Sequence, residues 1–93
     1  MSTFVMFGKY SMDATKAMST KRTDQAMNLL KQNGGEFKAG YALLGGTDLV
    51  LIVDLPSIEA AMKFSAELSK MQGISFTTSP AVRTANTRQK GRS

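Results

Sequence analysis

The order of apolar segments along the chain predicts four strands and two helices. Residues 3–9 are rich in aromatic and β-branched side chains, which is typical of a strand. Residues 11–19 have weak helical character. Residues 20–33 carry apolar side chains at helical spacing, and they end at Gly34, which can take the left-handed conformation that closes a helix.

The second half of the chain continues with two strands, a helix and a last strand. Residues 36–44 alternate in the manner of a strand, and residues 48–54 are apolar at nearly every position. Residues 57–71 have helical spacing and end before Gly73. Residues 74–82 alternate again and predict the fourth strand.

This order of elements predicts a ferredoxin-like βαββαβ fold of the α+β class. Short connections and right-handed crossovers favour one four-stranded antiparallel sheet with the strand order 4-1-3-2. The two central strands of that order are the most apolar, and one edge strand carries Pro80, which cannot donate a backbone hydrogen bond. We therefore expect a single domain over residues 1–83 and a flexible basic tail over residues 84–93.

Alternation along the strands predicts which side chains share a face of the sheet. In the second strand one face holds Phe37, Ala39, Tyr41 and Leu43, and the other holds Glu36, Lys38, Gly40 and Ala42. In the first strand, Val5 and Phe7 lie on one face and Phe4 and Met6 on the other. In the third strand, one face holds Leu49, Leu51 and Val53, and the other holds Val50 and Ile52. Both central strands are thus apolar on both of their faces.

A sheet that is apolar on both faces predicts self-association. Two helices cover only one face, and an apolar patch on the order of several hundred Å² is rarely left in water. At about 25 cal/mol per Å², covering it is worth many kcal/mol before association costs. The simplest cover is the same face of a second copy in a two-fold homodimer, whose two sheets would form an α+β barrel. The alternative is a tail folded over the sheet, but this tail is short and basic.

The composition excludes several chemistries. The chain of 93 residues contains no cysteine and no histidine, so the usual protein ligands of zinc, copper and haem are missing. Catalysis by Ser-His-Asp or Cys-His groups is excluded for the same reason. We expect no metal site and no bound cofactor.

The charge of the chain is concentrated in its tail. Three of the 12 basic residues, Arg88, Lys90 and Arg92, lie in residues 84–93, which contain no acidic residue. The common RNA-binding module with this strand–helix order stacks bases on aromatic side chains of its third strand. Residues 48–54 have no aromatic and no basic residue, which argues against nucleic acid as a partner.

No segment of the sequence indicates a membrane or a secretory pathway. The apolar runs are far shorter than the roughly 20 residues of a membrane-spanning helix. The first residues lack the basic start and the long apolar stretch of a signal peptide. We therefore expect a cytoplasmic protein with no membrane partner.

The glycine-rich run Gly45-Gly46-Thr47-Asp48 raises the question of a phosphate-binding loop. Such a loop needs a lysine and follows a strand into a helix, whereas this run has no lysine and joins two predicted strands. A tight hairpin turn, in which glycine supplies a positive φ, is the interpretation that we favour.

Five polar residues are the ones that we expect to approach a pocket at the ends of the sheet, and they are candidates for contact with a ligand: Lys9, Tyr10, Arg22, Tyr41 and Asp48. Tyrosine beside lysine or arginine can bind a carboxylate or a phenolate. The alternative is that each tyrosine is half-buried at a subunit boundary and each charge is a solvated surface group. Asp48 is the candidate acid or base if the protein is an enzyme.

Several short motifs occur together along the chain: Phe4-Val-Met-Phe-Gly-Lys-Tyr-Ser11, Arg22, Gly34-Gly35, Tyr41-Ala-Leu-Leu-Gly-Gly-Thr-Asp-Leu-Val50 and Gly73 to Val82. With these motifs, residues 3–83 resemble the GYD domain family. The Gly-Tyr-Asp run that names the family reads Gly46-Thr47-Asp48 here, so its tyrosine is absent. The resemblance implies a dimeric α+β barrel but no established activity. Proteins with the same barrel include cofactor-free monooxygenases, lactone isomerases, haem enzymes and small-molecule sensors.

Three functions are compatible with these observations. The first is a small-ligand-binding homodimer with an apolar pocket at the sheet face and the five polar candidates near its mouth. The second is a cofactor-independent monooxygenase or isomerase that acts on an apolar or aromatic compound, with Asp48 as its acid or base. The third is a purely structural or interaction dimer.

Overall fold

The computed structural model describes residues 1–10 and 20–84. The weak helix expected over residues 11–19 and nearly all of the basic tail lie outside the described residues. The elements follow the predicted order: β1 (Ser2–Tyr10), α1 (Thr20–Gln32), β2 (Glu36–Ala42), β3 (Leu49–Leu55), α2 (Ile58–Gln72) and β4 (Ile74–Ala81).

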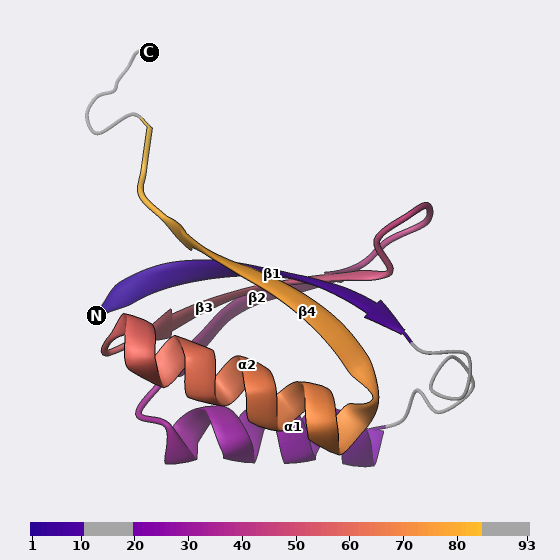
Figure 1. The fold of residues 1–93 in the computed structure, drawn as a ribbon, viewed down its shortest axis with the longest axis horizontal. Coiled ribbons are helices and arrows are strands. Elements are labelled where there is room, and N and C mark those ends of the chain that lie inside the picture. The colour runs from indigo at the N-terminus through magenta and orange to yellow at the C-terminus, as the bar shows by residue number, and fades with distance from the viewer. Residues whose placement is uncertain (11–19, 85–93) are drawn as a thin grey trace.

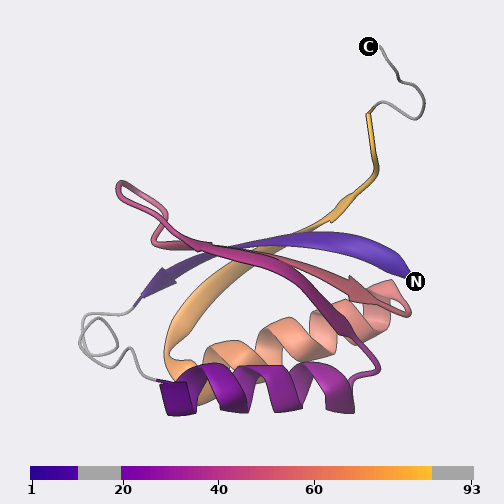
Figure 2. The same ribbon diagram turned by 180° about the vertical axis from the view of Figure 1, so that it is seen from behind.

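The strands form one antiparallel sheet in the order β2-β3-β1-β4, which is the predicted order read from the other edge. The α+β class, the sheet and its order are therefore confirmed. Both helices lie on the same side of the sheet, as Figures 1 and 2 show from the front and from behind. The molecule thus has two layers, and one face of the sheet has no described element over it.

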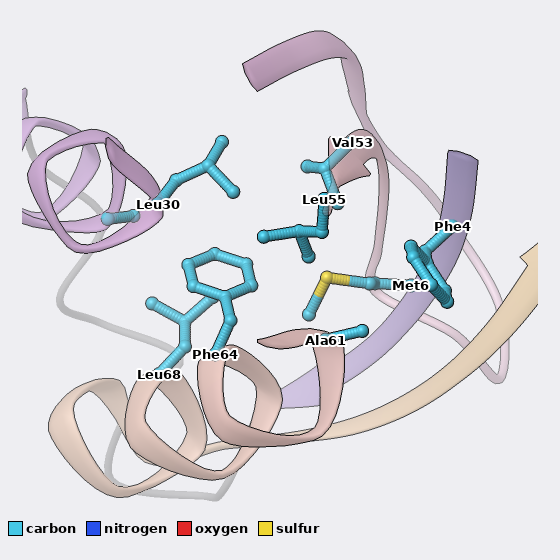
Figure 3. Close-up of a cluster of buried hydrophobic side chains, with 9 residues drawn as sticks. Phe4, Met6, Leu30, Val53, Leu55, Ala61, Phe64 and Leu68 are labelled. Carbon is cyan, nitrogen blue, oxygen red and sulfur yellow. The ribbon is translucent and has the colours of Figure 1, made fainter. Parts of the chain in front are cut away.

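The core fills the space between the helices and the central strands (Figure 3). Its buried side chains come from β1, β3 and both helices: Phe4, Met6, Ala26, Leu30, Val53, Leu55, Ala61, Phe64 and Leu68. On β1 and β3 these residues alternate with others that face away from the helices, as the pairs Phe4–Val53 and Val5–Ile52 show. The predicted division of the two central strands into two apolar faces is confirmed.

Helix α2 has a cap at each end. The side chain of Ser57 accepts a hydrogen bond from the backbone N–H of Ala60 at 3.1 Å, which satisfies one donor of the first turn. Gly73 ends the helix at φ 67°, in the left-handed region that favours glycine, and its N–H donates to the Ser69 carbonyl. The Ser57 cap fixes where α2 begins, and the Gly73 cap fixes where it stops and β4 can begin.

The predicted faces of β2 are wrong in one respect. A β-bulge between Phe37 and Ala39 shifts the register with β3, so that Phe37 is paired with Val53 and Tyr41 with Val50. Because these two β3 residues point to opposite faces, Phe37 lies on the helix-covered side while Tyr41 lies on the open side. Simple alternation had placed them together, and it cannot reveal an inserted residue.

The open face of the sheet has an apolar centre, formed by Val5, Phe7, Ala39, Tyr41, Val50 and Ile52. Phe7 is 43% exposed and Tyr41 is 59% exposed, whereas Phe4 on the covered side of β1 is only 1% exposed. The tip of the β2–β3 hairpin and the segment that follows β4 both extend away from the helices, beyond this face (Figures 1 and 2). We call the six residues of the apolar centre the open-face patch.

Candidate functional site

A cavity of about 280 Å³ lies between the sheet and the two helices. Its walls are mainly apolar and include Ala26, Met27, Phe37, Leu51, Leu68 and Phe76. Pockets for small molecules are commonly built in this way, with apolar walls and a few polar groups that set orientation. The cavity is on the helix-covered side, whereas the sequence led us to expect a pocket at the open sheet face.

Two glycines of the sheet, Gly8 and Gly40, lie beneath aromatic side chains of the cavity wall. A Cβ atom on Gly8 would lie 2.7 Å from the Phe76 ring, so this ring packs directly over the β1 backbone. A Cβ atom on Gly40 would lie 3.0 Å from Cζ of Phe37 and 3.2 Å from Cδ2 of Leu51. Because both glycines lack a side chain, these neighbouring side chains can lie close to the sheet backbone.

Polar side chains gather at one end of the cavity. Tyr10 is the last residue of β1, Gln72 is the last residue of α2, and Arg22 and Thr23 lie in the first turn of α1. A guanidinium N–H of Arg22 donates to the Gln72 carbonyl, and the Gln72 side-chain amide donates to the Arg22 carbonyl at 2.6 Å. This reciprocal pair joins the start of α1 to the end of α2.

The charge of Arg22 suits its position. The last carbonyls of a helix carry partial negative charge, and a cation near them is stabilising. The Arg22 side chain is half-buried, so it is not simply a solvated surface group. Among the described residues that line the cavity, Arg22 is the one with a formal charge.

The structure divides the five predicted site residues between two places. Tyr10 and Arg22 line the cavity, and Tyr41 borders it from the edge strand β2, although the register of β2 places its side chain on the open face. Lys9 and Asp48 do not line it, and they support the nearby strand ends instead. The Asp48 carboxylate accepts the backbone N–H of Tyr10 at 3.0 Å, and the Lys9 ammonium donates to the Gly46 carbonyl at 3.0 Å.

The Gly45-Gly46 run is a hairpin turn, as predicted. The Leu43 N–H donates to the Asp48 carbonyl at 2.8 Å, and Gly45 has φ 123°. The Asp48 N–H in turn donates to the Gly8 carbonyl at 2.9 Å. Backbone groups and the Asp48 carboxylate thus tie the turn to the end of β1.

Several residues that form the cavity are not among the five candidates expected from the sequence. Gln72 carried one available signal, since it is the residue before the helix-ending Gly73 and therefore had to lie at a helix terminus. Met27, Phe37 and Phe76 carried no such signal, because an apolar residue that lines a cavity looks in the sequence like any core residue.

A second hollow lies on the surface between α2 and β4, and it is lined in part by Ile58, Met62, Ser65 and Thr78. Ile58 is 58% exposed and Met62 is 68% exposed, so this groove is open to solvent. Within residues 1–10 and 20–84, no group of three or more carboxylate, histidine or cysteine side chains could hold a metal ion.

Comparison with known families gives a match over nearly the whole chain. The model of the GYD domain family matches residues 4–89. This chain belongs to the GYD domain family. The matched range contains both helices, strands β2, β3 and β4, all of β1 from Phe4 onward, and every described residue of the cavity. No curated protein matches this GYD domain in sequence.

Solved structures share the fold of this GYD domain. A crystal structure of a transcriptional regulator superposes with a TM-score of 0.69 at 13% identity, covering 97% of the GYD chain and 56% of the regulator. The leucine response regulatory protein LrpA of Mycobacterium tuberculosis superposes with a TM-score of 0.59 at 14% identity and also has 56% of its chain covered. The chain therefore spans about half the length of these regulators, and at this identity the likeness concerns the fold alone.

The described helices of this GYD domain do not include one that could cross a membrane, because none is sufficiently long and apolar.

Proposed function

We propose that this GYD domain is a homodimer that binds a small, largely apolar molecule in the cavity between its sheet and its helices. The cavity is the observation that carries the proposal, because a volume of about 280 Å³ corresponds to roughly nine water molecules at ~30 Å³ each. Apolar side chains dominate its walls, and its polar groups converge at one end. That combination supports binding of a compact ligand in one orientation.

The dimer is proposed from the open-face patch. Val5 faces Ile52 and Phe7 faces Val50 across the two central strands, so the apolar centre is continuous. Polar residues border it: β4 presents Ser75, Thr77 and Ser79 on this face, and the other side has Lys38 and Asp54 at 3.7 Å. An apolar centre inside a polar rim is the usual anatomy of a protein interface. A second copy of the same face covers it in a closed two-fold arrangement.

The observations favour ligand binding over catalysis by Asp48. The carboxylate of Asp48 accepts the Tyr10 N–H, and Asp48 is not among the residues that line the cavity. We therefore assign Asp48 a role in positioning the end of β1, and with it Tyr10. The role of a general acid or base in a monooxygenase or isomerase has no support from its contacts.

The ligand site is tested by filling the cavity. Ala26→Leu adds apolar volume to a wall position that is 8% exposed, without altering any of the polar residues at the cavity's end. The matched control is Met62→Lys, which changes the groove between α2 and β4 instead. Binding of 2-naphthamide, a neutral bicyclic probe, is measured by calorimetry and by NMR shifts, with circular dichroism to verify folding.

We expect 2-naphthamide to bind the wild-type protein, to lose at least about tenfold in affinity in Ala26→Leu, and to be unaffected by Met62→Lys. If the probe binds and Met62→Lys removes binding while Ala26→Leu does not, the ligand site is the surface groove and the proposal is wrong. If neither 2-naphthamide nor the corresponding carboxylate, 2-naphthoate, binds, the cavity is not a binding site.

A further inference from the structure

We infer that the β2–β3 hairpin is a dimerisation arm, whose tip lies against the sheet of a second copy of this chain. We call residues 43–48 the hairpin arm. The inference rests on the proposed homodimer and adds the segment with which each copy holds the other. It is independent of the cavity, because none of the arm's residues lines it.

The open-face patch is too small to form a stable interface by itself. Specific, stable interfaces bury about 800 Å² on each partner and involve roughly 20–30 residues a side. The patch has six residues, and its polar rim adds only a few more on β4 and around Lys38 and Asp54. Further surface on the same side of the sheet must therefore take part when the open face binds a second copy.

The hairpin arm supplies apolar surface that continues from the patch. Tyr41 belongs to the patch, and Leu43 and Leu44 follow it along the chain. Leu44 is fully exposed and Leu43 is 39% exposed. A Cβ atom placed on Gly45 would meet no described atom within 4 Å, so the tip is surrounded by open space. Leu44 therefore has no packing role among the described residues of its own protomer, which favours a contact with another molecule.

Contacts at the base of the arm hold it in place beyond the open face. The Lys9 ammonium donates to the Gly46 carbonyl at 3.0 Å, and the Asp48 N–H donates to the Gly8 carbonyl at 2.9 Å. These bonds tie the arm to the end of β1, and Figure 1 shows that its tip extends away from the helices. Because the arm is held before a partner arrives, less conformational entropy is lost when it makes contact. Lys9 and Asp48, which do not line the cavity, thus have a role in positioning the arm.

A second copy fits between two projecting segments of the open face. Leu49, which follows the arm, is paired with Gly8 near one end of β1, and Ala81 is paired with Thr3 near the other end. The segment after β4 also extends beyond the open face (Figures 1 and 2), and its Val82 is 90% exposed. The face is thus bordered by an apolar projection at each end. In a closed two-fold pair each copy contributes one arm and receives one, so both arms are covered at once.

The inference is tested by placing a charge at the tip of the arm. Leu44→Glu does so, and Met62→Glu is the matched control, because Met62 is a 68% exposed residue of α2 on the helix-covered side. Analytical ultracentrifugation measures the dimer dissociation constants of wild type, both variants and Phe7→Glu, and circular dichroism verifies folding. We expect Leu44→Glu to raise the constant by about tenfold or more, because an apolar contact is lost and a charge is buried. Met62→Glu should leave the constant unchanged.

A second measurement locates the tip on the partner. The chain has no cysteine, so a nitroxide attached to Leu44→Cys labels a single site. The nitroxide-labelled protein is mixed with isotope-labelled wild type, so that only contacts between copies broaden the detected amide signals. We expect the broadened signals to come from the strands of the isotope-labelled copy rather than from its helices.

Failure of the arm and failure of the dimer are distinguishable. If wild type is a dimer that Phe7→Glu dissociates, but Leu44→Glu leaves its dissociation constant unchanged, the arm is overturned while the proposed homodimer stands. Equal weakening by Leu44→Glu and Met62→Glu, or a dimer in which the nitroxide broadens only helix signals or none, also overturns the arm. A wild-type protein that remains monomeric would show that the proposed homodimer itself has failed, and the arm with it.

Discussion

The two faces of the sheet carry similar apolar side chains and have different surroundings. On β1, Phe4 and Met6 are 1% and 0% exposed beneath the helices, whereas Phe7, three residues after Phe4, is 43% exposed on the open face. The covered face is enclosed by the chain's own helices, yet it leaves a cavity of about 280 Å³. The open face has no such cover among the described elements. We propose that the covered surface encloses a small molecule and that the open surface meets a second protomer.

The comparison predicts that the covered face dominates the stability of the protomer. Phe64→Ala removes a ring that is 1% exposed and packs in the core from α2. The expected cost is about 3–5 kcal/mol of unfolding free energy, from lost burial and the void left behind. Chemical denaturation measures it, with Ile58→Ala on the exposed side of the same helix as the control. A loss below about 1 kcal/mol would contradict the assigned core.

The open face should control association. Phe7→Glu places a charge in the centre of the open-face patch, and Met71→Glu places the same charge on α2 at nearly equal exposure, 45% against 43%. Replacement of a central interface residue commonly costs about 2 kcal/mol or more of binding free energy, so the dimer dissociation constant should rise by about 30-fold. Light scattering after size-exclusion chromatography follows the shift to monomer. An equal shift in Met71→Glu would place the interface on the helices.

The cap of α2 tests a local contribution on the covered side. Ser57→Ala removes the acceptor for the Ala60 N–H and should lower the unfolding free energy by about 1 kcal/mol. Ser57→Asp keeps an acceptor and should retain most of the stability. Thermal or urea unfolding compares the wild type with the two variants. If Ser57→Ala and Ser57→Asp lose the same unfolding free energy, the cap contributes nothing.

The smallest effect is expected at the rim of the open face. Lys38 and Asp54 are 3.7 Å apart, and the Lys38 side chain is 50% exposed, so Lys38→Ala should change protomer stability by less than about 1 kcal/mol. Thr3→Val, which removes the 2.6 Å hydrogen bond to the Asp54 carboxylate, is the neighbouring comparison. Urea unfolding measures both variants at low and high salt. A loss for Lys38→Ala well above 1 kcal/mol would mean that the ion pair is buried by a partner.

Much of the fold was predictable because its signals are local. Glycines mark the ends of both helices, and the apolar runs of β1 and β3 identify the central strands. Their alternation also indicated that the sheet has two apolar faces. Alternation failed in β2, since the bulge between Phe37 and Ala39 arises from pairing with β3 and has no clear sign in the strand's own sequence.

The candidate site was less predictable because it depends on distant contacts. The pairing of Arg22 with Gln72 joins residues 50 positions apart, and no periodic pattern connects them. Tyr10 could have been assigned to the covered side, because it shares its strand parity with Phe4, Met6 and Gly8. The cavity itself lies where the helices pack against the sheet, with side chains of neighbouring strands close over two glycines, and a list of apolar residues does not reveal this.

The most direct test of the account is a nuclear Overhauser experiment on a mixture of two differently labelled copies of the wild-type protein. It detects contacts only between protomers. The account predicts signals between the Phe7 ring of one copy and the Val50 and Ile52 methyl groups of its partner, across the paired open faces. Intermolecular signals that arise from α1 or α2 instead, or a protein that stays at the chain mass of 10.0 kDa, would contradict it.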